Sequence, residues 1–169
     1  MTTPGAQRRR RKPDRLPIFP PDNELPVALE KKPLVWRSAD VGITATGFLV
    51  YSTGVLFRLI ALSKGVTLGF EDPLGQFAGE EGRHVARTGQ QPAGPLQLGA
   101  HGVPVTSHDT SRSDSWLKIE AWAPFPPGGD LIFYLEWPAG NIEYCEFGVP
   151  RSAAANAIVL WPPEPSSAD

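Results

Sequence analysis

The sequence predicts a mainly β protein, an antiparallel β-sandwich with one short C-terminal helix and a disordered N-terminal arm. Two observations lead to this class. Apolar and polar side chains alternate with a period of two in several segments, which is the pattern of strands in a packed sheet. The 169 residues also include 19 prolines and 17 glycines, and both residues are unfavourable inside helices. Short strands separated by turn residues favour a sandwich, Ig-like or jelly-roll-like, over a helical bundle.

Residues 1–33 are predicted to be a disordered arm, rich in proline and basic residues. The first 15 residues carry a net charge of +5, which leaves −7 on the remainder of the chain. An acidic body argues against a specific nucleic-acid interface, because phosphate contacts need a basic surface. The arm could touch anionic polymers or lipid non-specifically, although a solvated tail is the simpler interpretation. Within the arm, residues 25–29 could pair as an edge strand, where proline is tolerated.

The first clear strand spans residues 41–51. Strict alternation through this segment puts Ile43 and Phe48 on opposite faces. Ser52-Thr53-Gly54 supplies a tight turn, and residues 55–62 form the partner strand of a hairpin. Both faces of that second strand are mostly apolar, as expected for a strand covered on both sides.

We place the domain at residues 34–163, with a disordered tail at 164–169. The middle of the domain, residues 71–115, is rich in glycine and shows little periodicity, which predicts a long loop. One short strand is expected just before this loop, at residues 66–70, and another inside it, at residues 96–98.

Regular alternation returns in the last third of the chain, between turns rich in proline and glycine. It predicts strands over residues 116–122, 131–137 and 142–147, a short helix over 153–157 and a closing segment over 158–161. Ser152 is the expected N-cap of the helix.

Several motifs in this region resemble a family of uncharacterised β-rich proteins from high-GC bacteria. They are Trp122-Ala123-Pro124-Phe125-Pro126-Pro127-Gly128, Glu136-Trp137-Pro138-Ala139 and Val159-Leu160-Trp161-Pro162. The resemblance covers residues 40–63 and 112–163 and implies a bacterial source. It implies no activity, so no residue takes a functional role from it.

Cysteine content and the N-terminus bear on the compartment. Cys145 is the single cysteine, and a loop-rich secreted protein would usually carry disulfide pairs, so a cytoplasmic location is expected. Prolines interrupt the apolar residues at 16–21, where a signal peptide needs an unbroken run. Residues 41–57 carry no formal charge, but their glycines and alternation favour strands over a membrane span. We expect Cys145 to be a structural thiol whose acidic neighbours raise its pKa.

The histidines offer a candidate metal site. His101, His108 and Asp109 carry imidazole and carboxylate groups that suit zinc or manganese, and His84 lies in the same region. Their spacing matches no zinc signature, so ordinary solvated side chains are the simpler interpretation, and no cofactor is expected.

Two carboxylates offer a candidate hydrolytic site. Glu120 and Glu136 lie on strands expected to be neighbours, where opposed side chains are about 5 Å apart. Retaining glycosidases use a similar separation, and Trp116, Trp122 and Tyr134 could stack on sugar rings. The alternative is a solvated strand face, and glutamates on opposite sheets would end the hydrolase hypothesis.

The function expected from the sequence is a non-catalytic protein-binding or accessory module, whose partner is a protein. The alternative is a carbohydrate-active or metal-dependent hydrolase. It would use Glu120 with Glu136, or the loop that carries His84, His101 and His108.

Overall fold

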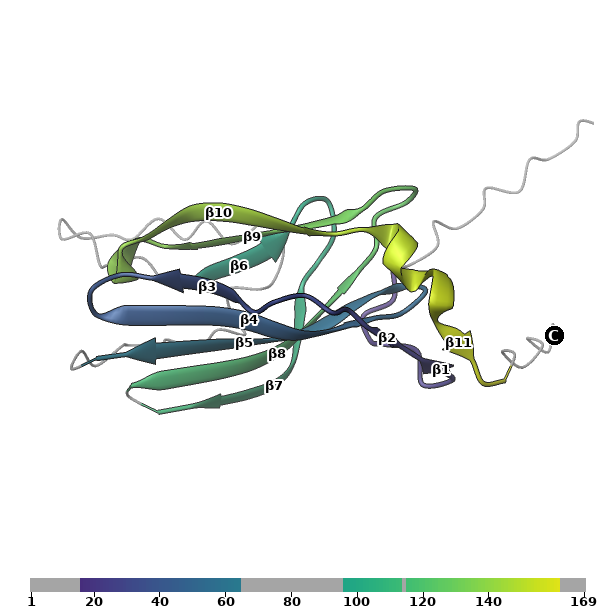
Figure 1. The fold of residues 1–169 in the computed structure, drawn as a ribbon, viewed down its shortest axis with the longest axis horizontal. Helices are drawn as coiled ribbons and strands as arrows, with labels where there is room; N and C mark the ends of the chain where they lie inside the picture. The colour runs from purple at the N-terminus through teal and green to yellow at the C-terminus, as the bar shows by residue number, and fades with distance from the viewer. Residues whose placement is uncertain (1–15, 65–95, 114, 162–169) are drawn as a thin grey trace, which may run out of the picture.

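The structure is a computed structural model that describes residues 16–64, 96–113 and 115–161. Two antiparallel sheets pack face to face (Figure 1), which confirms a mainly β, sandwich-like protein. Four parts of the sequence-based prediction lie outside the described residues: the basic segment before residue 16, the short strand at 66–70, His84 and the tail at 164–169.

The larger sheet has six strands in the order β2-β4-β5-β8-β7, with β3 also paired to β4. Its strands are β2 (Val27–Ala28), β3 (Leu34–Arg37), β4 (Val41–Val50), β5 (Gly54–Ser63), β7 (Thr106–Arg112) and β8 (Trp116–Pro124). β3 pairs with the first half of β4 and β2 with its end, so the two short strands together cover one edge of β4.

The smaller sheet has three strands in the order β10-β9-β6. They are β6 (Gln97–Ala100), β9 (Leu131–Trp137) and β10 (Ile142–Val149). A separate ribbon pairs β1 (Glu24–Leu25) with β11 (Ile158–Val159) at one end of the sandwich (Figure 1).

The core lies between the two sheets and is centred on four phenylalanines. Phe57 stacks on Phe48 with ring centroids 5.4 Å apart and meets Phe133 edge-on at 4.7 Å. Phe147 stacks on Phe133 at 5.0 Å. Two of these rings come from the larger sheet and two from the smaller sheet, so they join the layers and bury large apolar area.

The predicted hairpin is confirmed, but the predicted faces of its first strand are correct only up to Thr46. β4 and β5 are joined at Ser52-Thr53, and the Tyr51 backbone N–H donates to the Gly54 carbonyl at 2.8 Å. Within β4, Gly47 and Phe48 both lie opposite Phe57 because a β-bulge interrupts the register. The backbone of Gly47 has a φ of +64°, which glycine adopts at little cost. The extra residue turns Phe48 to the same buried face as Ile43.

The structure places part of the predicted arm, residues 16–33, before the expected domain start at residue 34. Residues 16–33 lie against the domain and contribute β1 and β2. Glu24 is buried, and its carboxylate accepts hydrogen bonds from the backbone N–H and the hydroxyl of Ser52. A short strand within residues 25–29, in contrast, is confirmed as β2.

Two strands, β6 and β7, fall inside the predicted loop at 71–115, and only β7 was not expected there. β6 confirms the short strand expected near 96–98. The residues of β7 are polar and show no apolar alternation. β7 lies at the edge of the larger sheet, and edge strands need not bury both faces.

The C-terminal helix is present as a 3-10 helix, η3 (Arg151–Asn156). Its N-cap is Pro150 rather than Ser152, and the Arg151 N–H is satisfied by the carboxylate of Asp130 at 2.9 Å. The segment 158–161 does not close against the main sheets as predicted. It pairs with β1 instead, and its side chains are exposed. Within the described residues, no helix has the length and apolar character that crossing a membrane requires.

Candidate functional site

The paired-carboxylate hypothesis is contradicted by the topology. Glu120 lies on β8 in the larger sheet, whereas Glu136 lies on β9 in the smaller sheet. Each alternates with buried residues and therefore points away from the core, on opposite outer faces of the sandwich. Glu120 is 3.6 Å from the Arg58 guanidinium in a partly exposed ion pair, and Glu136 lies on the other side of the sandwich.

The aromatic residues expected beside those carboxylates are separated in the same way. Trp116 lies at the start of β8 and is 36% exposed. Trp122 lies on the same outer face but is completely buried, and its indole N–H donates to the Pro17 carbonyl. Tyr134 lies on the outer face of the smaller sheet. The predicted sugar platform is therefore not assembled.

The histidine site is also not assembled. His101 follows β6 in the smaller sheet, and His108 lies beside Asp109 in β7 of the larger sheet. In the three described ranges, no three histidine, cysteine, aspartate or glutamate side chains are grouped so that they could hold a metal ion.

The structure instead brings four polar and aromatic side chains together on the outer face of the smaller sheet. We call this set, His101, Tyr134, Tyr144 and Glu146, the tyrosine–histidine patch. The Tyr144 hydroxyl donates to Glu146 Oε1 at 2.6 Å, and His101 Nε2 donates to the same oxygen at 2.7 Å. The Tyr134 ring lies between its neighbours, 6.0 Å from the Tyr144 ring and 5.5 Å from the His101 ring.

These hydrogen bonds set the protonation of the patch. The bond to Glu146 raises the pKa of Tyr144 to about 12, because the carboxylate holds the phenolic proton. The bonds from Tyr144 and His101 lower the pKa of Glu146, because both stabilise the ionised carboxylate. The patch therefore presents an ionised carboxylate that accepts hydrogen bonds from the Tyr144 hydroxyl and the His101 ring.

Gly99 on β6 makes the arrangement possible. It is directly opposite Tyr134, and a Cβ at position 99 would lie 2.2 Å from the Tyr134 ring. The sequence analysis identified His101 and Tyr134 but missed Tyr144 and Glu146. The spacing of two between Tyr144 and Glu146 on a predicted strand places both on one face, and that signal could have found them.

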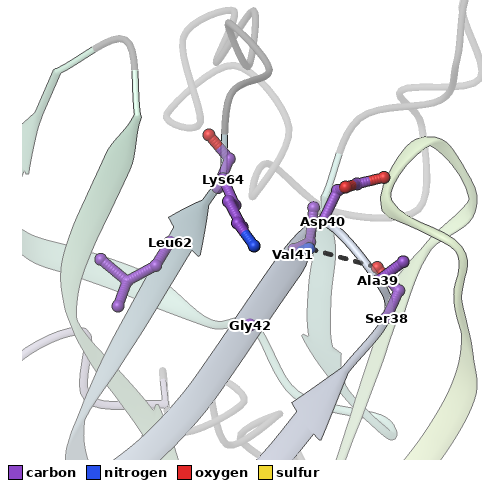
Figure 2. Close-up of a pocket in the computed structure, with 8 residues that line it drawn as sticks. Ser38, Ala39, Asp40, Val41, Gly42, Leu62 and Lys64 are labelled. Carbon is purple, nitrogen blue, oxygen red and sulfur yellow. Dashed lines mark hydrogen bonds between the residues drawn. The ribbon is translucent and has the colours of Figure 1, made fainter.

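A shallow hollow lies where β4 begins and β5 ends, beside the turn that joins β3 to β4 (Figure 2). It is lined by residues 38–42 and 62–64. Lys64 and Asp40 are its ionisable residues, and Figure 2 shows the Val41 N–H bonded to the Ser38 hydroxyl beside them. One lysine and one aspartate in an open hollow do not form a recognisable catalytic set.

No protein-family model matches the chain, and comparison with curated proteins and with solved structures gave no match either. The fold and the patch together define the class of molecule: an antiparallel β-sandwich with an ordered aromatic surface on its smaller sheet.

Proposed function

We propose that the protein is a non-catalytic binding module, active in the cytoplasm of a bacterium, whose partner is a protein that contacts the tyrosine–histidine patch. The observation that carries this proposal is the pair of hydrogen bonds from Tyr144 and His101 to one oxygen of Glu146. They hold a half-exposed aromatic ring in one position on a rigid sheet.

An ordered aromatic ring favours binding for a physical reason. Tyrosine supplies a large contact area with few rotatable bonds, so little side-chain entropy is lost when a partner covers it. Hydrogen bonds that fix Tyr144 before binding lower that cost further. Tyrosine is also enriched in protein interfaces, near the buried centre of the contact.

The charge around the patch indicates the chemistry of the partner. Glu146 belongs to the patch, Glu136 and Glu143 lie on the same two strands, and the chain beyond residue 15 is acidic. An arginine of the partner could stack on Tyr144 and pair with the carboxylate of Glu146. We therefore propose that the partner surface is basic.

The test compares partner capture by three full-length proteins: the wild type, Tyr144→Ala and Trp116→Ala. Trp116 is the matched control, because it is an exposed aromatic side chain on the opposite outer face. Each protein is immobilised and exposed to a lysate of the source organism, and bound proteins are quantified by mass spectrometry. A glycan array is probed with the same three proteins.

A protein that is bound by the wild type and by Trp116→Ala, and lost with Tyr144→Ala, supports the proposal. Equal capture by all three proteins, or no specific capture, would contradict it. A glycan whose binding depends on Tyr144 would also contradict it, because the patch would then recognise carbohydrate rather than protein.

A further inference from the structure

Residues 16–20 lie as a strap, with a bend at Ile18 and Phe19, across the outer face of the larger sheet, the face opposite the tyrosine–histidine patch. The Pro17 carbonyl accepts the indole N–H of Trp122 at 3.1 Å. The next carbonyl, that of Ile18, accepts the hydroxyl of Thr106, also at 3.1 Å. The Phe19 ring meets His108 edge-on, with ring centroids 5.1 Å apart.

The strap covers a strip of surface on β5, β8 and β7 and on the turn that joins β4 to β5, and we call this strip the groove. Thr106 on β7 is directly opposite Trp122 on β8. The Tyr51 ring meets the indole edge-on at 5.6 Å. Gly54 on β5 leaves room for the indole, because a Cβ there would lie 2.7 Å from its ring. The groove therefore holds an aromatic floor with one N–H and one hydroxyl donor.

Backbone carbonyls hold the strap at Pro17 and Ile18, and the side chains of Leu16 and Phe19 add apolar and ring contacts. Ile18 and Phe19 are 55% and 59% exposed, although their segment covers a completely buried tryptophan. Both groove donors bind carbonyl oxygens, which every residue carries. Proline at position 17 restricts the backbone at the first of these two carbonyls, since its ring fixes φ.

Two further observations indicate that the strap is a replaceable occupant. Residues 16–20 form no strand in the structure, so the attachment rests on side-chain donors rather than on a ladder of backbone hydrogen bonds. The groove also retains unused polar capacity, since among the described residues the buried Nε2 of His108 has no hydrogen-bond partner. A ligand with an additional donor or acceptor could use this atom.

We propose that the groove is a peptide-binding site for segments of the type proline–apolar–aromatic, and that the strap occupies it as an internal ligand. A partner protein that presents such a segment displaces residues 16–20 and takes over the bonds from Trp122 and Thr106. This site is separate from the patch on the smaller sheet, so each can fail without the other.

Because the strap belongs to the same chain as the groove, a free peptide must compete with it for the site. A segment attached to its site by a short linker has an effective concentration in the millimolar range, so a peptide added in solution binds the wild type weakly. Weakening the strap should therefore strengthen binding of the free peptide without any change to the groove itself.

The probe is a fluorescently labelled synthetic peptide, Leu-Pro-Ile-Phe-Pro-Pro, which reproduces residues 16–21. Its affinity is measured by anisotropy for three full-length proteins. They are the wild type, the strap variant Pro17→Gly with Phe19→Ala, and the strap variant that also carries Thr106→Val. We expect at least tenfold tighter binding to the strap variant than to the wild type, and loss of that gain with Thr106→Val. A control peptide with glycine in place of each proline should bind at least tenfold more weakly.

A second measurement uses the wild type, so the test holds even if the strap variant folds poorly. The indole N–H resonance of Trp122, assigned with Trp122→Phe, is followed by NMR as the proline peptide is added to millimolar concentration. A saturable shift supports displacement of the strap. The proposal is overturned if the resonance does not move, if the strap variant gains no affinity, or if Thr106→Val leaves the gain intact.

Discussion

The ring of Tyr134 lies across the backbone of Gly99, the residue directly opposite it on the neighbouring strand. A Cβ at position 99 would lie 2.2 Å from the Cζ and the hydroxyl oxygen of Tyr134, closer than real contacts allow. On the other outer face, Gly54 leaves room for the Trp122 indole although it is paired with Pro124, since a Cβ there would lie 2.7 Å from the ring and 2.4 Å from the Ala123 carbonyl oxygen. In both cases a glycine lets a large aromatic ring lie flat over the sheet, and each proposed binding surface is built on one such pair.

Gly99→Ala is therefore expected to lower the free energy of unfolding by about 1–3 kcal/mol, the usual cost of overpacking a well-packed site. The methyl group must push Tyr134 away from Tyr144 and His101. Urea unfolding of the variant measures the loss.

A double-mutant cycle identifies the cause of that loss. Residues in contact are energetically coupled, so Gly99→Ala should cost much less when Tyr134 is already alanine. Gly42→Ala is the control, because a Cβ there meets nothing within 4 Å, and we expect a change within about 0.5 kcal/mol. Equal losses in both Tyr134 backgrounds would show that the ring is not responsible.

Tyr144 should ionise at unusually high pH. Its ordinary pKa of 10.0 is raised to about 12 by the hydrogen bond to Glu146. A raised pKa in the folded state means that this contribution to stability is complete below pH 10 and is lost as the pH rises toward 12. The absorbance of phenolate near 295 nm, recorded against pH, measures the ionisation.

Glu146→Gln and Tyr144→Phe separate the contributions to that titration. Replacing the carboxylate should move one ionisation step toward pH 10, and removing the hydroxyl should delete the highest step. Tyr51 also has a raised pKa, chiefly through burial, and should be unaffected by either change. An identical titration of the wild type and Glu146→Gln would mean that the hydrogen bond does not hold the proton.

At acid pH, the lowered pKa of Glu146 predicts that the contribution of this carboxylate to stability is lost as the pH falls through that lowered value.

Strands could be predicted from the sequence because period-two alternation is a local property. The alternation of Phe57 and Leu59 in β5, and of Leu117 and Ile119 in β8, matches the buried face of the larger sheet. Which strands pair is not local. β8 and β9 follow each other in the chain, but the segment between them crosses from one sheet to the other instead of forming a hairpin. That single step separates Glu120 from Glu136.

The burial of Trp122 was also beyond local reasoning. It lies in the outward-facing set of β8, where alternation predicts exposure, yet it is completely buried. The cover comes from Pro17 and its neighbours, 105 residues away in sequence. The proline-rich composition of that segment predicted an arm, because composition reports a lack of regular structure and not where the segment lies.

The bulge at Gly47 makes a separate prediction about the first strand. No atom lies within 4 Å of a Cβ placed at this position, so Gly47→Ala meets no steric clash. Its positive φ alone should cost about 1–2 kcal/mol, the penalty for a residue with a Cβ in the left-handed region. Urea unfolding of Gly47→Ala beside Gly42→Ala, on the same strand, isolates the effect. Equal stability of the two variants would show that the backbone relaxes out of the bulge.

Cys145 should be a slow nucleophile while the protein is folded. Burial raises the pKa of its thiol, and a hydrogen bond with the backbone of Leu135 offsets the rise only in part. A smaller thiolate fraction at pH 8 means slower alkylation, because the thiolate is the reactive form. Iodoacetamide should therefore modify the native protein several-fold more slowly than the protein in urea. The rate for the native protein should also begin to rise at a higher pH than the rate for the unfolded protein. Cys145→Ser provides the blank, since this is the single cysteine. Native and unfolded rates that coincide across the pH range would instead require an accessible thiol of ordinary pKa, and would return Cys145 to the set of candidate reactive residues.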